Sequence, residues 1–111
     1  MPEHHRIAFQ LRLRPGMATA YDESHRAVWP EMLALLKSAG ISEYSIFRRD
    51  ETLILVMTLP SERTFDQVWN QIEADPINTR WQQAMAPYFD PLPALRQGER
   101  FPMLNEVFYL P

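Results

Sequence analysis

The chain contains no cysteine and has only three glycines in 111 residues. Without cysteine it cannot form disulfides, use a thiolate in catalysis, or build the zinc and iron–sulfur sites that need thiolate ligands. The glycines, Gly16, Gly40 and Gly98, lie far apart, so the sequence has no glycine-rich loop for the phosphates of a nucleotide. Thiol chemistry and the common dinucleotide-binding motifs are therefore excluded.

Long apolar runs and dense clusters of positive charge are also missing. The formal net charge is −3 and acidic and basic residues are interleaved, so we expect no nucleic-acid binding. No segment reaches the length of a membrane span, and the first residues lack the apolar stretch of a signal peptide. Together these absences predict a cytoplasmic protein that binds neither nucleic acid nor membrane.

What is present is the composition of an ordinary globular protein. Hydrophobic residues make up 46% and charged residues 23% of the chain, and the length suits one domain with its own core. We therefore treat residues 1–111 as a single domain. No internal repeat or low-complexity tract interrupts it.

Two hydrophobic periods follow one another along the chain: a spacing of two, typical of strands, and a spacing of three and four, typical of helices. Pro30 falls inside the first helical segment, and because proline has no N–H for the helix, we expect a kink or restart near Trp29. The predicted strands are 6–14, 43–49, 52–59 and 104–110; the predicted helices are 17–39, one opening at Pro60-Ser61, and one that follows Asp75-Pro76 and ends before Pro87; residues 90–102 are predicted to be loop.

This order of elements, β-α-β-β-α-β, predicts an α+β domain of the ferredoxin-like kind, with a four-stranded antiparallel sheet and helices on one face. The segment 52–59 is almost continuously apolar, so both of its faces should be covered. Because no helices remain for the second face, we expect a second copy of the sheet to cover it, which makes the protein a homodimer.

Only one histidine stands in a predicted helix. His25 has Tyr21 one turn before it and Trp29 one turn after it, all on the apolar stripe of the first helix. With His4 and His5 on an N-terminal arm that we expect to be flexible, no histidine-rich metal site can form, so we predict no metal. The pattern is typical either of a core histidine with satisfied nitrogens or of a cavity between helix and sheet.

Further side chains could reach such a cavity. Tyr44 opens the second strand and Gln10 lies in the middle of the first, although the sequence leaves their register open. Trp81 is either a core anchor packed with Met85 or a flat platform for the C–H face of a sugar. Trp69 has regular helical neighbours and is interpreted as core. Residue spacing by itself thus indicates an α+β domain and leaves its function open.

Three motifs relate the chain to a known family. They are Tyr21-x-x-x-His25-x-x-x-Trp29-Pro30-Glu31 with Leu36-Lys37-Ser38-x-Gly40 after it, Tyr44-Ser45-Ile46, and the terminal Glu106-Val107-Phe108-Tyr109-Leu110-Pro111. In these motifs the sequence resembles the L-rhamnose mutarotases, over nearly its whole length from Arg6 to the C-terminus.

The resemblance implies a dimeric α+β barrel that interconverts the α and β anomers of L-rhamnose without a cofactor. It implies that His25 is the proton donor and that Tyr21, Tyr44, Trp81 and Gln82 bind the sugar. At position 82 the sequence departs from the family, which has a second tryptophan there. An amide in place of an apolar ring could change which hydroxyls are recognised, so another deoxy sugar such as L-fucose is an alternative substrate.

Mutarotation opens the sugar ring to an aldehyde and closes it on the other face. It needs one group to protonate the ring oxygen and another to take the proton of the anomeric hydroxyl. We hypothesise that His25 exchanges the proton at the ring oxygen, because its ordinary pKa of about 6.5 suits transfer in both directions. Tyr21 or an ordered water would serve the anomeric hydroxyl.

Two other classes of protein use the same architecture. One is a non-catalytic dimeric ligand-binding module, which would bind a sugar without changing the rate of anomer exchange. The other is a monooxygenase, either cofactor-free or with His25 as an axial haem ligand.

Overall fold

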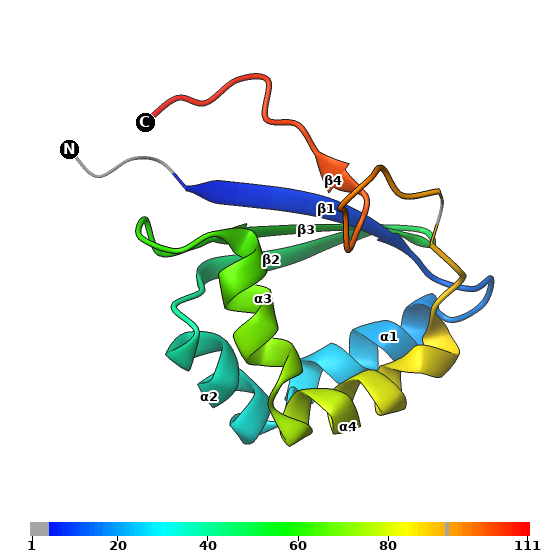
Figure 1. The fold of residues 1–111 in the computed structure, drawn as a ribbon. Helices are drawn as coiled ribbons and strands as arrows, with labels where there is room; N and C mark the ends of the chain where they lie inside the picture. The colour runs from blue at the N-terminus through cyan, green and yellow to red at the C-terminus, as the bar shows by residue number, and fades with distance from the viewer. Residues whose placement is uncertain (1–4, 93) are drawn as a thin grey trace.

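The computed structural model describes residues 5–92 and 94–111 (Figure 1). Within these residues the chain forms a four-stranded antiparallel sheet with its helices on one face. The elements are β1 (Arg6–Arg12), α1 (Ala18–Ser24), a 3₁₀ turn (His25–Ala27), α2 (Pro30–Ser38), β2 (Ser42–Arg49), β3 (Thr52–Thr58), α3 (Phe65–Glu73), α4 (Pro76–Met85), a second 3₁₀ turn (Ala86–Tyr88) and β4 (Met103–Leu104).

The strand order across the sheet is β2-β3-β1-β4, and every neighbouring pair is antiparallel. The first helical connection, α1 and α2, joins β1 to β2, and the second, α3 and α4, joins β3 to β4. This topology is the ferredoxin-like arrangement, so the predicted fold class is confirmed. None of the helices in residues 5–92 and 94–111 combines the length and the apolar character needed to cross a membrane.

The predicted break in the first helical segment is confirmed. Helix α1 ends at Ser24, a 3₁₀ turn follows, and Val28 and Trp29 are extended, with ψ angles of 136° and 134°. Pro30 then starts α2 at its first position. The cause is the proline ring, which disfavours helical dihedrals in the residue before it and provides no N–H. As a result His25 lies at the end of a helix instead of in the middle of one.

The predicted start of the next helix at Pro60-Ser61 is wrong, because α3 begins at Phe65. Thr64 caps this helix: its side chain accepts from the Gln67 N–H at 3.1 Å, and the Gln67 side chain accepts from the Thr64 N–H at 2.9 Å. This reciprocal capping box fixes the helix start at Phe65, five residues after Pro60. Pro60 instead packs against Gly40, where a Cβ atom would overlap the proline ring.

The predicted final strand, 104–110, is also largely wrong. Only Met103–Leu104 pairs with β1, at Phe9 and Ala8. Since β1 begins at Arg6, little of its edge remains beyond Ala8 for a longer strand to pair with. The segment after β4 runs away from the helical layer (Figure 1) with several apolar side chains in solvent: Val107 is 95% exposed and Phe108 78%.

The core lies between the sheet and the helices. Along β3 the residues facing the helices are buried, whereas those on the other face are only half-buried. In a single copy of the chain the helices therefore cover only one face of the sheet, whereas the sequence predicted that both faces are covered. The buried hydrophobic residues are Phe9, Leu13, Tyr21, Met32, Leu35, Ala39, Ile41, Leu53, Leu55, Met57, Leu59, Val68, Ile72, Trp81 and Met85.

The loop after α4 is fastened to α3 just before β4. Arg100 lies 3.3 Å from an Asp66 carboxylate oxygen and also donates to Glu73 and Asn70. The next side chain, Phe101, stacks on Phe9 at a ring distance of 4.5 Å. These contacts fix the approach of the chain to the edge of the sheet.

Candidate active site

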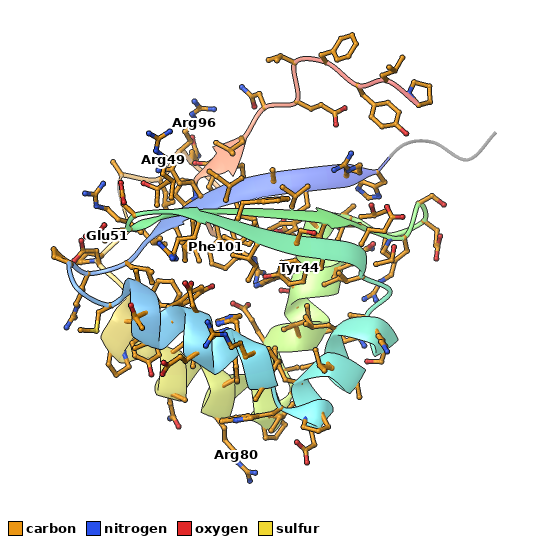
Figure 2. The ribbon with its side chains drawn as sticks, turned by 180° about the vertical axis from the view of Figure 1, so that it is seen from behind. Tyr44, Arg49, Glu51, Arg80, Arg96 and Phe101 are labelled. Carbon is orange, nitrogen blue, oxygen red and sulfur yellow. The ribbon has the colours of Figure 1, made fainter. Side chains whose placement is uncertain are left out.

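A pocket of about 530 Å³ opens between the helical layer and the β2 side of the sheet. Its size falls within the range of roughly 300–1,000 Å³ that is usual for small-molecule sites. Figure 2 shows Tyr44 on the side of the sheet that faces the helices, whereas Arg80 of α4 projects outward from the helical layer. The pocket brings together four of the five predicted site residues: His25, Tyr44, Trp81 and Gln82.

His25 is held through one nitrogen of its ring. Its Nδ1 lies 3.0 Å from the carbonyl oxygen of Tyr21 and 2.9 Å from the Ser24 hydroxyl oxygen. The Ser24 hydroxyl donates its own hydrogen to the same Tyr21 carbonyl at 2.6 Å. Since a carbonyl only accepts, Nδ1 carries the hydrogen and donates it. In neutral imidazole the other nitrogen, Nε2, then has the free lone pair.

The rings around His25 restrict it further and change its acidity. Tyr21 stacks on it with a ring distance of 4.1 Å, and the edge of Trp81 approaches at 5.6 Å. Burial lowers the pKa of His25, while the hydrogen bond to the Tyr21 carbonyl and the nearby charge of Asp22 oppose this shift. The neutral ring therefore prevails at neutral pH, and Nε2 is able to accept a proton.

Tyr21 lies behind His25 and is not among the residues that line the pocket. It is buried, with 4% of its surface exposed. Burial, and secondly the charge of Asp22, raises the pKa of its hydroxyl. The structure thus gives Tyr21 contact with the histidine ring, and its predicted contact with sugar stays a prediction.

An ion pair fixes the helix that carries Tyr21 to the sheet. Arg48 of β2 donates from Nε to one carboxylate oxygen of Asp22 at 2.8 Å and from Nη2 to the other at 2.6 Å. The hydrogen bonds from Arg48 lower the pKa of Asp22. This bidentate pair sets the position of α1 relative to β2.

Tyr44 reaches the pocket from an irregular part of β2. The pairing of β2 with β3 shifts register between Ser42 and Ser45, and Glu43 has a positive φ of 48°. A bulge of this kind changes the direction of nearby side chains. Tyr44 is half-buried, and burial raises the pKa of its hydroxyl. At neutral pH it is a neutral phenol that can both donate and accept hydrogen bonds.

Helix α4 supplies one wall of the pocket. Asp75 caps it by accepting from the Ile77 N–H at 2.9 Å, and Pro76 occupies the first helical position, as the sequence predicted. Trp81 is 7% exposed and meets the ring of Trp29 edge-on at 5.0 Å. Trp81 therefore packs in the core and also lines the pocket. Its role as a platform for a sugar stays a prediction.

The structure also corrects the expectations for other residues. Gln10 alternates with buried Phe9 and pairs with Ile54 on the opposite face of the sheet, so it does not reach the pocket. Trp69, interpreted as core, both stacks on Phe65 at 4.9 Å and lines the pocket. His5 was expected to lie on a flexible arm, but its Nδ1 lies 2.9 Å from the Pro60 carbonyl oxygen.

Asn78 is a buried pocket residue that the sequence pattern did not single out. It lies one helical turn before Gln82 and is 7% exposed. The signal was a second amide four residues from Gln82, which places both on the same side of the helix. His4 was placed on the N-terminal arm and lies outside the described residues. In residues 5–92 and 94–111 no group of three or more histidine, aspartate or glutamate side chains could hold a metal ion.

The sheet order, the helices on one face and the pocket between the layers define the class: this is the fold of the dimeric α+β barrel proteins. The chain is similar to the crystal structure of an L-rhamnose mutarotase from Formosa agariphila, with a TM-score of 0.74 and 30% identity over 96% of this chain and 99% of that one. It shares the fold of tetracenomycin F2 cyclase from Streptomyces glaucescens, with a TM-score of 0.60 and 18% identity over 96% and 95% of the two chains.

Sequence comparison places the chain within one family of this class. The family model described as L-rhamnose mutarotase matches residues 6–110. An L-rhamnose mutarotase of Burkholderia ambifaria is 38% identical over 109 residues, which cover 95% of this chain and 97% of that protein. Another, from Verminephrobacter eiseniae, is 36% identical over 100 residues, 81% and 92% of the two. The chain belongs to the L-rhamnose mutarotase family, and it is an isomerase.

Proposed function

We propose that this protein interconverts the α and β anomers of L-rhamnose in the pocket between α4 and β2, with His25 as the proton carrier. The observation that carries the proposal is the fixed histidine ring. Its Nδ1 is engaged by the Tyr21 carbonyl, while the ring itself lines the pocket. This arrangement leaves Nε2 as the nitrogen that can exchange protons with a bound sugar.

The neutral histidine sets the order of the proton transfers. His25 Nε2 first accepts the proton of the anomeric hydroxyl, and the electrons left on that oxygen form the C1 carbonyl as the bond from C1 to the ring oxygen breaks. The imidazolium then donates the same proton to the released ring oxygen. Because both oxygens were bonded to one carbon, a single nitrogen can serve both, so this mechanism replaces the second group, Tyr21 or a water, that we hypothesised from the sequence. Rotation about C1–C2 and the reverse steps close the ring to the other anomer.

The remaining pocket residues hold the sugar in this mechanism. Trp81 offers an apolar surface for the C–H groups of the ring, and Tyr44 and Gln82 offer hydrogen bonds to its hydroxyls. Tyr21, stacked behind His25, positions the imidazole. A second candidate substrate is L-fucose, because the amide of Gln82 stands where the family has an apolar tryptophan ring.

Saturation-transfer proton NMR on equilibrated L-rhamnose tests the proposed activity. We expect saturation of one anomeric proton to pass to the other only with protein present, and His25→Phe to reduce the catalysed exchange by about 10²–10⁴-fold. His5→Phe, which changes a histidine outside the pocket, should leave the exchange unchanged. Sugar binding by folded protein without exchange would favour the binding module, and full activity of His25→Phe would exclude the mechanism.

We further propose that a second copy of the chain covers the outer face of the sheet. An apolar band crosses this face: the strand pairings place Phe47 beside Ile54, and Ala8 between Val56 and Leu104. Phe47 is 62% exposed and Leu104 41%. Two such bands facing one another would remove both from water, as in aligned sheet packing. The exposed apolar residues after β4 would be buried with them.

A further inference from the structure

Asn78 is the one buried polar or charged residue in the part of the chain that the structure describes, with 7% of its surface exposed. It lines the pocket beside apolar side chains such as Met32, Leu36 and Ile72. A buried amide loses its hydrogen bonds to water, so its donors and acceptor need partners nearby. The partners of Asn78 therefore indicate what the amide does.

Only one half of the Asn78 amide is occupied by the protein. Its Oδ1 accepts a hydrogen bond from Gln82 Nε2 at 3.3 Å. No partner for Nδ2 is found among residues 5–92 and 94–111, yet in that same part of the chain no fully buried side-chain nitrogen or oxygen lacks a partner. The Nδ2 group is therefore not fully enclosed by the protein, and Asn78 lines the pocket. Gln82 holds the Oδ1 side of this amide and leaves its two donor hydrogens free for a ligand.

The helix does not need this amide for its own stability. Its N-terminus is already capped by Asp75 and begins with Pro76. Leucine has the same branching and the same number of side-chain heavy atoms as asparagine, is a better helix former, and would face an apolar wall without burying a polar group. A ligand that hydrogen-bonds Asn78 would explain why the wall is polar at this point.

We propose that Asn78 is a specificity-determining residue, whose amide, oriented by Gln82, donates a hydrogen bond to a hydroxyl group of the bound sugar. The proposal rests on the proposed function. Trp81, three residues further along the same helix, faces the same pocket with an apolar ring. The α4 wall then recognises a sugar by one apolar C–H face and by a hydroxyl of fixed configuration next to it. L-Rhamnose and L-fucose, both 6-deoxy sugars, differ in configuration at C2 and C4 and should be told apart here.

The test is the ratio of kcat/KM for these two sugars in the wild-type protein and in Asn78→Leu. The substitution removes the amide and keeps the branching of the side chain. For the better substrate we expect kcat/KM to fall about 10–100-fold, mainly through KM, whereas the poorer one should change by less than about threefold. The ratio of kcat/KM between the better and the poorer sugar should therefore fall.

Two controls separate this role from a structural one. Gln83→Leu removes an exposed amide from the same helix and should leave the ratio and both rates unchanged. Asn78→Leu should melt no lower than the wild type, because the partner of the amide, Gln82, is exposed and can donate to water instead. An equal fall for both sugars, an unchanged ratio, or a lower melting temperature would each overturn the proposal. Absence of exchange by the wild type with either sugar would instead overturn the proposed function.

Discussion

At the scale of single residues, the state of His25 depends on where its ring is buried and on what holds Nδ1. Burial between Tyr21 and Trp81 disfavours the charged ring, and the carbonyl of Tyr21 assigns the hydrogen to Nδ1. Both effects favour a neutral histidine that accepts a proton at Nε2. They explain how a pocket with a single histidine can perform acid and base catalysis in succession.

The pH dependence of the rate follows from this state. Protonation of Nε2 removes the acceptor, so kcat/KM should be level near neutral pH and fall as the pH drops through the pKa of His25. Because burial lowers that pKa, the fall should be centred below the ordinary value of about 6.5. Exchange rates, corrected for the uncatalysed reaction and compared with an NMR titration of the ring, measure this. A rate that rises in acid would contradict the proposed order of proton transfers.

The sequence pointed to four residues that line the pocket and missed Asn78, the amide that pairs with Gln82. His25, Tyr44 and Trp81 belong to motifs of the resemblance or stand on apolar stripes, where a polar or aromatic residue is conspicuous. Asn78 was missed because asparagine near a helix start is usually explained by local capping. Its burial depends on how α4 packs against the sheet, and spacing alone does not reveal that.

At the scale of elements, the start of α4 decides where its pocket residues stand. Asp75→Ala removes the side chain that accepts from the Ile77 N–H, so we expect the free energy of unfolding to fall by about 1 kcal/mol. Urea unfolding measures the change. Thr79→Ala, an exposed substitution on the same helix, should not lower stability. Equal stability of Asp75→Ala and wild type would show that the cap contributes nothing.

The elements that the sequence predicted correctly have strong local signals. Pro30 breaks a helix wherever it falls, and Asp75-Pro76 combines a cap with a proline at the first helical position. The start of α3 was predicted wrongly because the spacing of Thr64 and Gln67, a capping box, outweighs the proline at 60. The prediction of the terminal strand was wrong for a different reason. A strand there can pair only with a free stretch of β1, and the length of that stretch depends on the whole sheet.

At the scale of the whole molecule, the uncovered sheet face predicts self-association. Ile54→Lys places a charge in the middle of the apolar band, where a single copy leaves the side chain half-exposed and a dimer would bury it. We expect the wild type to sediment as a dimer and this variant as a monomer with the same far-UV circular dichroism. Thr79→Lys on the helical side should stay dimeric. A monomeric wild type would refute the predicted interface.

The hydrogen bond between His25 Nδ1 and the Tyr21 carbonyl has a consequence for how the protein can vary. In many enzymes a carboxylate side chain sets the tautomer of a catalytic histidine, and one mutation can remove it. Here the acceptor is a main-chain atom four residues earlier in the chain, and every amino acid carries it. A substitution at position 21 would therefore change the ring that stacks on the histidine, while the acceptor that places the hydrogen on Nδ1 stays with the backbone.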